Sequence, residues 1–203
     1  DVTRRRTGGG GIYHDVVGEI SYSIAVPADA VSSDLTESYH RLLEPILQAF
    51  EWLDVPVTVA EESRPELYDP ACYLQALHPA HDLVVTDESG RSPRKISGNA
   101  QYREQDVVLQ HGSVTFSLRP ERNLAVFDDP GVSNSQFRER VTAIDQHTAA
   151  TRNTAVRAFE RSLRQWAGAY EGSWSEDELD RARELVDEKY GNRDWVRDRA
   201  GPR

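Results

Sequence analysis

The chain has 203 residues, which is enough for one domain with a substantial core and short for two. Its formal net charge is −10, with 34 acidic residues against 24 Lys and Arg residues, so its electrostatic field opposes binding to nucleic acid or to an anionic membrane surface. The single cysteine excludes a disulfide framework, and no apolar run approaches the roughly 20 residues that cross a bilayer, so we expect a soluble protein of the reducing cytoplasm.

A basic, glycine-rich segment opens the chain. Arg4, Arg5 and Arg6 are followed by Thr7 and by four glycines at positions 8–11. Glycine has no Cβ atom, so the backbone amides of such a run can approach an anion closely. The segment therefore predicts a phosphate or carboxylate site, with a flexible glycine-rich tail as the alternative. The alternating apolar pattern of residues 20–26, directly downstream, favours the site.

Hydrophobic periodicity predicts the remaining elements in chain order. We expect strands at residues 12–26, 55–60, 83–85, 94–101 and 107–116, a loop at 61–70, a turn at 88–93, a mobile loop at 119–136, and helices at 34–53, 154–166 and 175–190. Asp34 and Ser175, each followed three residues later by Glu, are typical helix N-caps. Because neighbouring strands are joined by turns, the pattern predicts an α+β domain with a largely antiparallel sheet and packed helices.

Two segments of this chain resemble one protein family. The stretch from Arg5 to Asp15, with its glycines followed by Tyr13 and His14, is similar to the signature of the lipoate–protein ligase and octanoyltransferase family, a relative of the biotin protein ligases. Residues 95–101 (Lys-Ile-Ser-Gly-Asn-Ala-Gln) and 109–113 (Leu-Gln-His-Gly-Ser) lie where that family carries its catalytic lysine. The resemblance implies a class II synthetase-like biotin/lipoate ligase catalytic domain over residues 1–196, with a polar tail at 197–203. Family members place several strands and a helix before the first motif, so we expect an N-terminal part to be missing.

The resemblance also assigns a site around Lys95. Of the 24 basic residues only Lys95 and Lys189 are lysines, and this acid-rich, arginine-dominated composition is typical of proteins adapted to high salt, as in a halophilic archaeon. In the family the lysine contacts the acyl carbonyl and the phosphate of the adenylate, and a compact ammonium suits that position better than a planar guanidinium. The residues predicted to bind substrate or adenylate are Arg5, Arg6, Thr7, Gly8, Gly9, Gly10, Tyr13, His14, Ser97, Gly98, Asn99, Ala100, His111 and Gly112.

Asp82 precedes an apolar strand and is the predicted ligand of Mg²⁺ beside a nucleotide. The alternative is an aspartate that merely caps the strand. Ligases of the family commonly have Asn-Asp at this place, whereas this chain has His81-Asp82.

Cys72 opens a second chemical route. Cofactor-independent octanoyltransferases of the superfamily carry a cysteine at about this place before the lysine motif, and Cys72 between Ala71 and Tyr73 resembles that arrangement. Such a cysteine forms an acyl-thioester intermediate. A small buried hydrophobic residue is the alternative interpretation.

Three functions follow from these features. The leading hypothesis is a lipoate–protein ligase that uses ATP and Mg²⁺ to form lipoyl-adenylate and acylates the lysine of lipoyl domains in 2-oxoacid dehydrogenase acyltransferase subunits or in glycine-cleavage H protein. The second is an ATP-independent octanoyltransferase that takes its acyl group from acyl carrier protein through Cys72, and the third is a non-catalytic lipoyl-binding module. Ligases of the family often carry a small C-terminal accessory domain, which we do not expect after Trp195, so the ligase hypothesis also predicts a need for the missing N-terminal part or for a separate accessory ligase chain.

Overall fold

The computed structural model describes residues 1–86 and 92–198, and the chain divides into two compact units. One unit combines Asp1–Gly8 with the segment that starts at Tyr170, and the other comprises Gly9–Ala169. Most of the predicted turn at 88–93 and of the predicted tail at 197–203 lies outside the described residues. Within the described ranges, no helix is long and apolar enough to cross a membrane.

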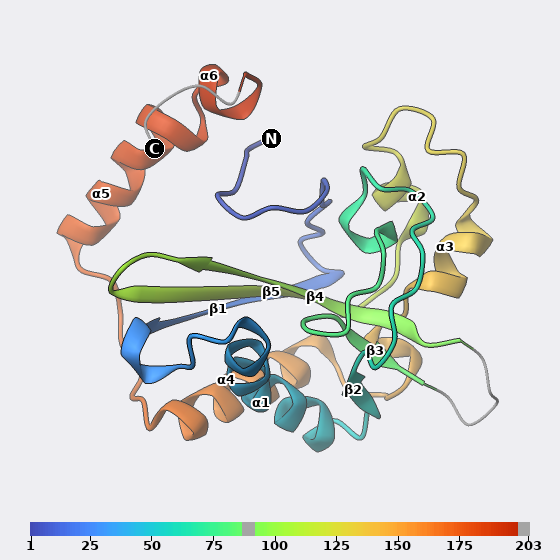
Figure 1. Cartoon of the computed structure of the whole chain (residues 1–203), viewed down its shortest axis with the longest axis horizontal. Helices are drawn as coiled ribbons and strands as arrows, with labels where there is room; N and C mark the ends of the chain where they lie inside the picture. The colour runs from blue at the N-terminus through green and yellow to red at the C-terminus, as the bar shows by residue number, and fades with distance from the viewer. Residues whose placement is uncertain (87–91, 199–203) are drawn as a thin grey trace. The chain divides into compact units, whose positions relative to one another are not determined.

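The larger unit is built on a five-stranded sheet whose neighbouring strands are all antiparallel. The strands follow the order β1 (Glu19–Pro27), β5 (Val107–Thr115), β4 (Arg94–Arg103), β3 (Leu83–Val85) and β2 (Val57–Val59) across the sheet. The α-helices of this unit are α1 (Leu35–Trp52), α2 (Pro120–Leu124), α3 (Asn134–Arg140) and α4 (Arg152–Ala167) (Figure 1). The predicted α+β class with an antiparallel sheet is thus confirmed.

One face of the sheet packs against α1 and α4 and holds the main core (Figure 1). Side chains alternate between faces along a strand, so Ile20, Tyr22 and Ile24 of β1 enter this core while Glu19 and Ser21 face the other way. Helix α1 begins at the predicted cap, since the Asp34 carboxylate accepts a hydrogen bond from the backbone N–H of Glu37.

The opposite face is covered by loops and short helices. The 3₁₀-helix η2 (Cys72–Leu74) and helices α2 and α3 enclose a second apolar cluster here. Its buried members are Ala71, Tyr73, Leu74, Leu124, Phe137 and Val141.

The smaller unit joins the first residues of the chain to its C-terminal helices, α5 (Glu176–Leu185), the π-helix η4 (Val186–Tyr190) and α6 (Arg193–Val196). The Arg4 side chain donates hydrogen bonds to the carbonyls of Trp195 and Val196, and Trp195 Nε1 donates to the Arg4 carbonyl at 2.8 Å. The Lys189 ammonium lies 4.2 Å from the centroid of the Trp195 rings. Arg4 therefore fastens the N-terminal segment to the last helices.

Two predicted boundaries are wrong. Residues 12–18 are not a strand, because Asp15 Oδ1 accepts the N–H groups of Val17 and Gly18 and closes a turn before β1. The predicted loop at 119–136 contains α2, which begins with Pro120 in the first helical turn, where a missing N–H costs nothing.

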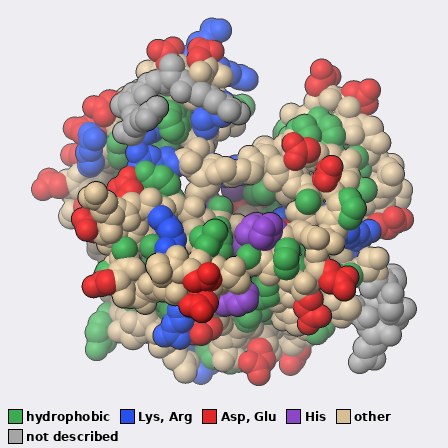
Figure 2. Space-filling view, viewed as in Figure 1, with side chains coloured by type: hydrophobic (Ala, Val, Ile, Leu, Met, Phe, Trp, Pro, Cys, Tyr) green, Lys and Arg blue, Asp and Glu red, His purple; other side chains and the backbone are tan. Residues whose placement is uncertain are grey.

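Acidic side chains are scattered over the visible face of the described residues in Figure 2. This distribution agrees with the net charge of −10.

Candidate active site around Lys95 and Cys72

Lys95 lies on β4 with its ammonium inside the protein. Its side chain is 5% exposed, and Nζ lies 2.8 Å from Oδ1 of Asp82, whose side chain is 2% exposed. Nζ also approaches the Cys72 carbonyl oxygen at 3.5 Å, which is long for a hydrogen bond. The Lys95 ammonium therefore lies beside the Asp82 carboxylate and the Cys72 carbonyl, and the sequence analysis had singled out all three residues separately.

Asp82 is held by its own turn. The backbone N–H of His78 donates to Asp82 Oδ2 at 2.9 Å, and His81 Nδ1 lies 3.6 Å from Oδ1. Burial alone would raise the pKa of Asp82, but His81, the charge of Lys95 and the His78 amide together hold that pKa below its usual value. The carboxylate is therefore ionised and paired at neutral pH.

Cys72 begins η2 and is partly exposed. Its N–H donates to the Gly11 carbonyl at 2.8 Å, and the Gly11 N–H donates to the Pro70 carbonyl at 2.7 Å. A Cβ at Gly10 would lie 2.5 Å from the Pro70 oxygen and 2.9 Å from the Cys72 nitrogen. The absence of a side chain at Gly10 thus lets the backbone at Gly10 and Gly11 pack directly on the backbone at Pro70 and Cys72.

Gly98 leaves room for the lysine. A Cβ at this position would lie 3.1 Å from Lys95 Cε and 3.3 Å from Nζ. In a regular strand, residues three apart point to opposite faces, but the pairing of β3 with β4 shifts register between Leu83 and Val84. We attribute the approach of the Lys95 side chain to Gly98 to this irregularity.

Asn99 lies in the sheet core, 7% exposed. Its Oδ1 accepts a hydrogen bond from the Tyr22 hydroxyl at 2.5 Å, and its Nδ2 donates to the His81 carbonyl at 2.7 Å. A Cβ at Gly112 would lie 2.2 Å from Asn99 Oδ1 and 2.3 Å from Tyr22 Cε1. Asn99 is thus hydrogen-bonded within the protein, and Gly112 leaves the space that the Asn99 and Tyr22 side chains occupy. Direct substrate contact by either residue stays a prediction.

His14 is bound to a buried carboxylate that the sequence analysis missed. His14 Nδ1 lies 2.7 Å from Oε1 of Glu19, which also accepts a hydrogen bond from the Ser21 hydroxyl. Burial would raise the pKa of Glu19, but the hydrogen bonds from His14 and Ser21 hold it below its usual value. The available signal was position, since Glu19 starts the alternating β1 pattern on the face opposite Ile20.

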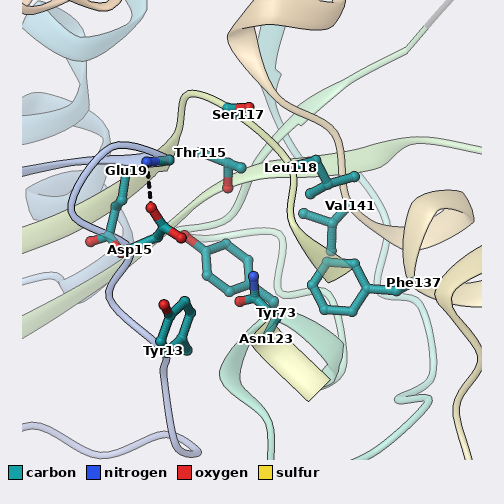
Figure 3. A pocket seen from close by; sticks show the side chains of 11 residues that line it. Tyr13, Asp15, Glu19, Tyr73, Thr115, Ser117, Leu118, Asn123, Phe137 and Val141 are labelled. Atoms are coloured by element: carbon teal, nitrogen blue, oxygen red, sulfur yellow. Dashed lines mark hydrogen bonds between the residues drawn. The ribbon is translucent and has the colours of Figure 1, made fainter. Parts of the chain in front are cut away.

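A pocket adjoins this carboxylate and the η2 segment (Figure 3). It is lined by Tyr13, Asp15, Gly18, Glu19, Tyr73, Thr115, Ser117, Leu118, Asn123, Phe137 and Val141. Figure 3 shows the Tyr73 ring between Asp15 and Phe137, and the Tyr73 hydroxyl lies 2.6 Å from Ser113 Oγ. Burial and the nearby Glu19 charge raise the pKa of Tyr73, so its hydroxyl stays protonated. Tyr73 is a second residue that the sequence analysis did not assign.

A smaller, more apolar pocket lies beside the first. Tyr13, Tyr73, Asn123 and Phe137 line both pockets, and the smaller one adds Gly11, Ile12, Ala71, Leu124 and Phe127.

The other predicted binding residues lie in several places. Ala100 and His111 face each other across β4 and β5, and Ser97 is fully buried on β4. Gly9 has a φ of 93°, a conformation that favours glycine. Arg5, Arg6, Thr7 and Gly8 belong to the smaller unit, where Arg5 Nη2 donates to the Gly8 carbonyl, and their part in ligand binding stays a prediction.

A magnesium ion does not fit the donor set at Asp82. Oδ1 of Asp82 contacts the Lys95 ammonium and Oδ2 accepts the His78 N–H, whereas Mg²⁺ binds carboxylate oxygens that are not already occupied in this way. Among the described residues, no three His, Cys, Asp or Glu side chains are grouped so that they could hold a metal ion. We derive no step through a metal.

Comparison with known proteins places the chain in one family. Residues 1–166 match the family model described as lipoyl protein ligase A/B catalytic domain. The chain is 30% identical to the octanoyltransferase LipM of Anoxybacillus flavithermus, over 95% of this chain and 72% of the relative, and 28% identical to that of Bacillus subtilis over the same shares.

Solved structures share the fold. A lipoate-protein ligase A bound with ATP aligns with a TM-score of 0.75 at 24% identity, covering 96% of this chain and 71% of the other. The bi-partite lipoate protein ligase of Thermoplasma acidophilum aligns with a TM-score of 0.71 at 22% identity, covering 96% and 69%.

Proposed function

The chain belongs to the lipoyl protein ligase A/B catalytic domain family, and from that premise we propose that it is an octanoyltransferase acting through Cys72. In this proposal it takes an octanoyl group from acyl carrier protein and transfers it to the lysine of a lipoyl domain. The octanoyltransferases among its relatives support this choice. This proposal replaces the hypothesis of an ATP-dependent ligase, which the sequence analysis favoured.

The observation that carries the proposal is the approach of the Lys95 ammonium to the segment that bears Cys72. Nζ lies 3.5 Å from the Cys72 carbonyl oxygen and is buried with its counter-ion Asp82. In this proposal the Cys72 side chain is the nucleophile, and the ammonium lies beside the backbone of the same residue. The same charge stabilises an oxyanion that develops on the acyl carbonyl, a contribution of about 3–4 kcal/mol for a well-placed donor.

The reaction then runs in two steps. The Cys72 thiolate attacks the thioester carbonyl, a carbon–sulfur bond to Cys72 forms, and the carbon–sulfur bond to the carrier breaks. The carrier leaves as a thiolate and takes up the proton that Cys72 released. In the second step the deprotonated acceptor lysine attacks the enzyme thioester, the carbon–sulfur bond breaks, and Cys72 returns as a thiol. One proton is released for each acceptor ammonium that becomes an amide.

The acyl chain needs an apolar wall near Cys72. The second apolar cluster, with Ala71, Leu124 and Phe137, begins at the residue before Cys72 and lines the smaller pocket. We place the octanoyl chain along this cluster, because burial of each methylene contributes about 0.8 kcal/mol.

The test uses the fact that Cys72 is the only cysteine in the chain. Wild type and Cys72→Ser are incubated with octanoyl-carrier protein and a lipoyl domain without ATP, and the acylated species are identified by intact mass. We expect wild type to transfer octanoate and to show an enzyme thioester, and Cys72→Ser to do neither. A protein that acylates only with lipoate, ATP and Mg²⁺, and equally well as Cys72→Ser, would be a ligase instead.

A further inference from the structure

We propose that Asp82 is the positioning residue of Lys95, and that Asn99, Tyr22 and Gly112 form a buried support that keeps Asp82 in place. The inference concerns the site of the proposed acyl transfer, so it rests on that function for its kinetic consequences. Its structural part, the fixing of one ammonium, is independent of the acyl donor.

The ion pair determines where the ammonium sits. A lysine side chain has four rotatable methylene groups and a point charge, so its end group is poorly fixed unless a partner holds it. Here the partner is the Asp82 carboxylate at 2.8 Å, and both groups are almost fully buried. Loss of one member leaves an uncompensated buried charge, which strongly favours a different side-chain position.

Asp82 is itself held at its side chain and at its backbone. Its Oδ2 accepts the His78 N–H at 2.9 Å, and the Asp82 carbonyl accepts the Ala60 N–H at 2.9 Å. The preceding residue is tied to the sheet, because Asn99 Nδ2 donates to the His81 carbonyl at 2.7 Å. The turn that presents Asp82 is thus bonded to the strand that carries Lys95.

Asn99 is oriented by a third strand. The Tyr22 hydroxyl of β1 donates to Asn99 Oδ1, which leaves Nδ2 directed at His81. Gly112 of β5 lies between them, since any Cβ there would overlap both the Asn99 oxygen and the Tyr22 ring. Asn99 and Gly112, which the sequence analysis assigned to substrate binding, therefore serve Lys95 through its carboxylate.

This arrangement has a kinetic signature. Because Asp82 and Asn99 act on Lys95 rather than on substrate, their loss lowers kcat and changes the KM for the acyl donor little. Displacement of a catalytic group by about 1 Å costs about a hundredfold in rate, so we expect a loss of that order in kcat for Asp82→Asn.

The direct test exploits the two lysines of the chain. Protein labelled with ¹⁵N-lysine contains two side-chain ammonium groups, those of Lys95 and Lys189, and Lys95→Arg identifies the first in the NMR spectrum. We expect a slowly exchanging ammonium signal from Lys95 in wild type and its disappearance or displacement in Asp82→Asn. The Lys189 signal is the internal control and stays unchanged.

Two further variants keep the test decisive. Tyr22→Phe removes only the hydroxyl that orients Asn99 and is expected to shift the Lys95 signal and lower kcat in a folded protein, even if Asp82→Asn fails to fold. Asp15→Asn is the matched control, since Asp15 is a buried carboxylate paired with Arg119 and Arg122. It should leave the Lys95 signal in place.

The outcomes separate the two proposals. An unchanged Lys95 signal in both Asp82→Asn and Tyr22→Phe overturns the positioning role, whatever the enzyme does. A signal that depends on Asp82, in a protein that transfers no octanoate without ATP, retains the positioning role and overturns the transferase.

Discussion

Replacing Gly98 by alanine tests how closely the position of the Lys95 ammonium is set. The new methyl carbon would lie 3.1 Å from Lys95 Cε and 3.3 Å from Nζ, and 3.8 Å from Asp82 Oδ1. Comfortable contacts between carbon atoms begin near 3.5 Å, so the lysine must retreat by about 0.4 Å. With only 5% of its side chain exposed, Lys95 retreats at the expense of its contacts with Asp82 or Cys72.

The two consequences of this change differ in size. A displacement of about 1 Å costs about a hundredfold, so a shift of about 0.4 Å should lower kcat about sixfold, or ~1.1 kcal/mol of transition-state stabilisation. Stability should change less, because alanine in a strand gains about 0.5–1 kcal/mol over glycine and offsets part of the crowding. The backbone adds no penalty, since Gly98 does not have a positive φ.

The assay is octanoyl transfer to a lipoyl domain, measured beside urea unfolding of the same variant. Gly168→Ala is the control, since Gly168 has a φ of 59° and nothing within 4 Å of a built Cβ. It should lose about 1 kcal/mol of stability through backbone strain and keep its activity. If Gly98→Ala retained full kcat, or lost activity only in step with its stability, our account of the lysine pocket would be wrong.

Three further changes test other parts of the structure. Lys95→Arg should reduce the rate of acyl transfer at least about a hundredfold in a steady-state assay. The reason is that a planar guanidinium cannot replace one compact charge in the space beside Gly98. Gly112→Ala should destabilise the protein by more than about 3 kcal/mol in denaturant titrations, since its Cβ would lie 2.2 Å from Asn99 Oδ1; a milder loss would show that the support can yield. The pKa of Glu19 is lowered in the folded state, so its contribution to the free energy of unfolding is present above its unfolded pKa, about 4.5, and is lost as the pH falls through the folded value. Glu19→Gln should therefore flatten the acid side of the stability–pH curve, and an unchanged curve would contradict the assigned hydrogen bonds.

The buried support of Asn99, Tyr22 and Gly112 shows that a residue within a family motif can have a structural role. Conspicuous glycine and amide positions next to a catalytic lysine invite assignment to substrate. Here Gly98 provides space for a side chain, Gly112 provides space for a hydrogen bond, and Asn99 holds a turn. Each residue has a close neighbour within the protein, so the structure gives it a role that does not require contact with a ligand.

The sequence by itself determined the local elements and the class of the fold. The apolar stripe of α1 and its Asp34 cap, the capping box of Ser175 with Glu178, and the two strands that became β4 and β5 depend on side chains within a few positions of one another. Periodicity and capping report such short-range effects directly. The motifs also identified the family.

Tertiary structure alone decided how the site residues pair. Asp82 and Lys95 meet because β3 and β4 are adjacent and their register shifts, and a shift of one residue reverses the face on which a side chain lies. The Cys72 carbonyl approaches the same ammonium, and the backbone that bears it packs closely against Gly10. Neither effect has a sequence period, since both depend on segments that are distant in the sequence, and this is why the sequence alone did not pair Asp82 with Lys95.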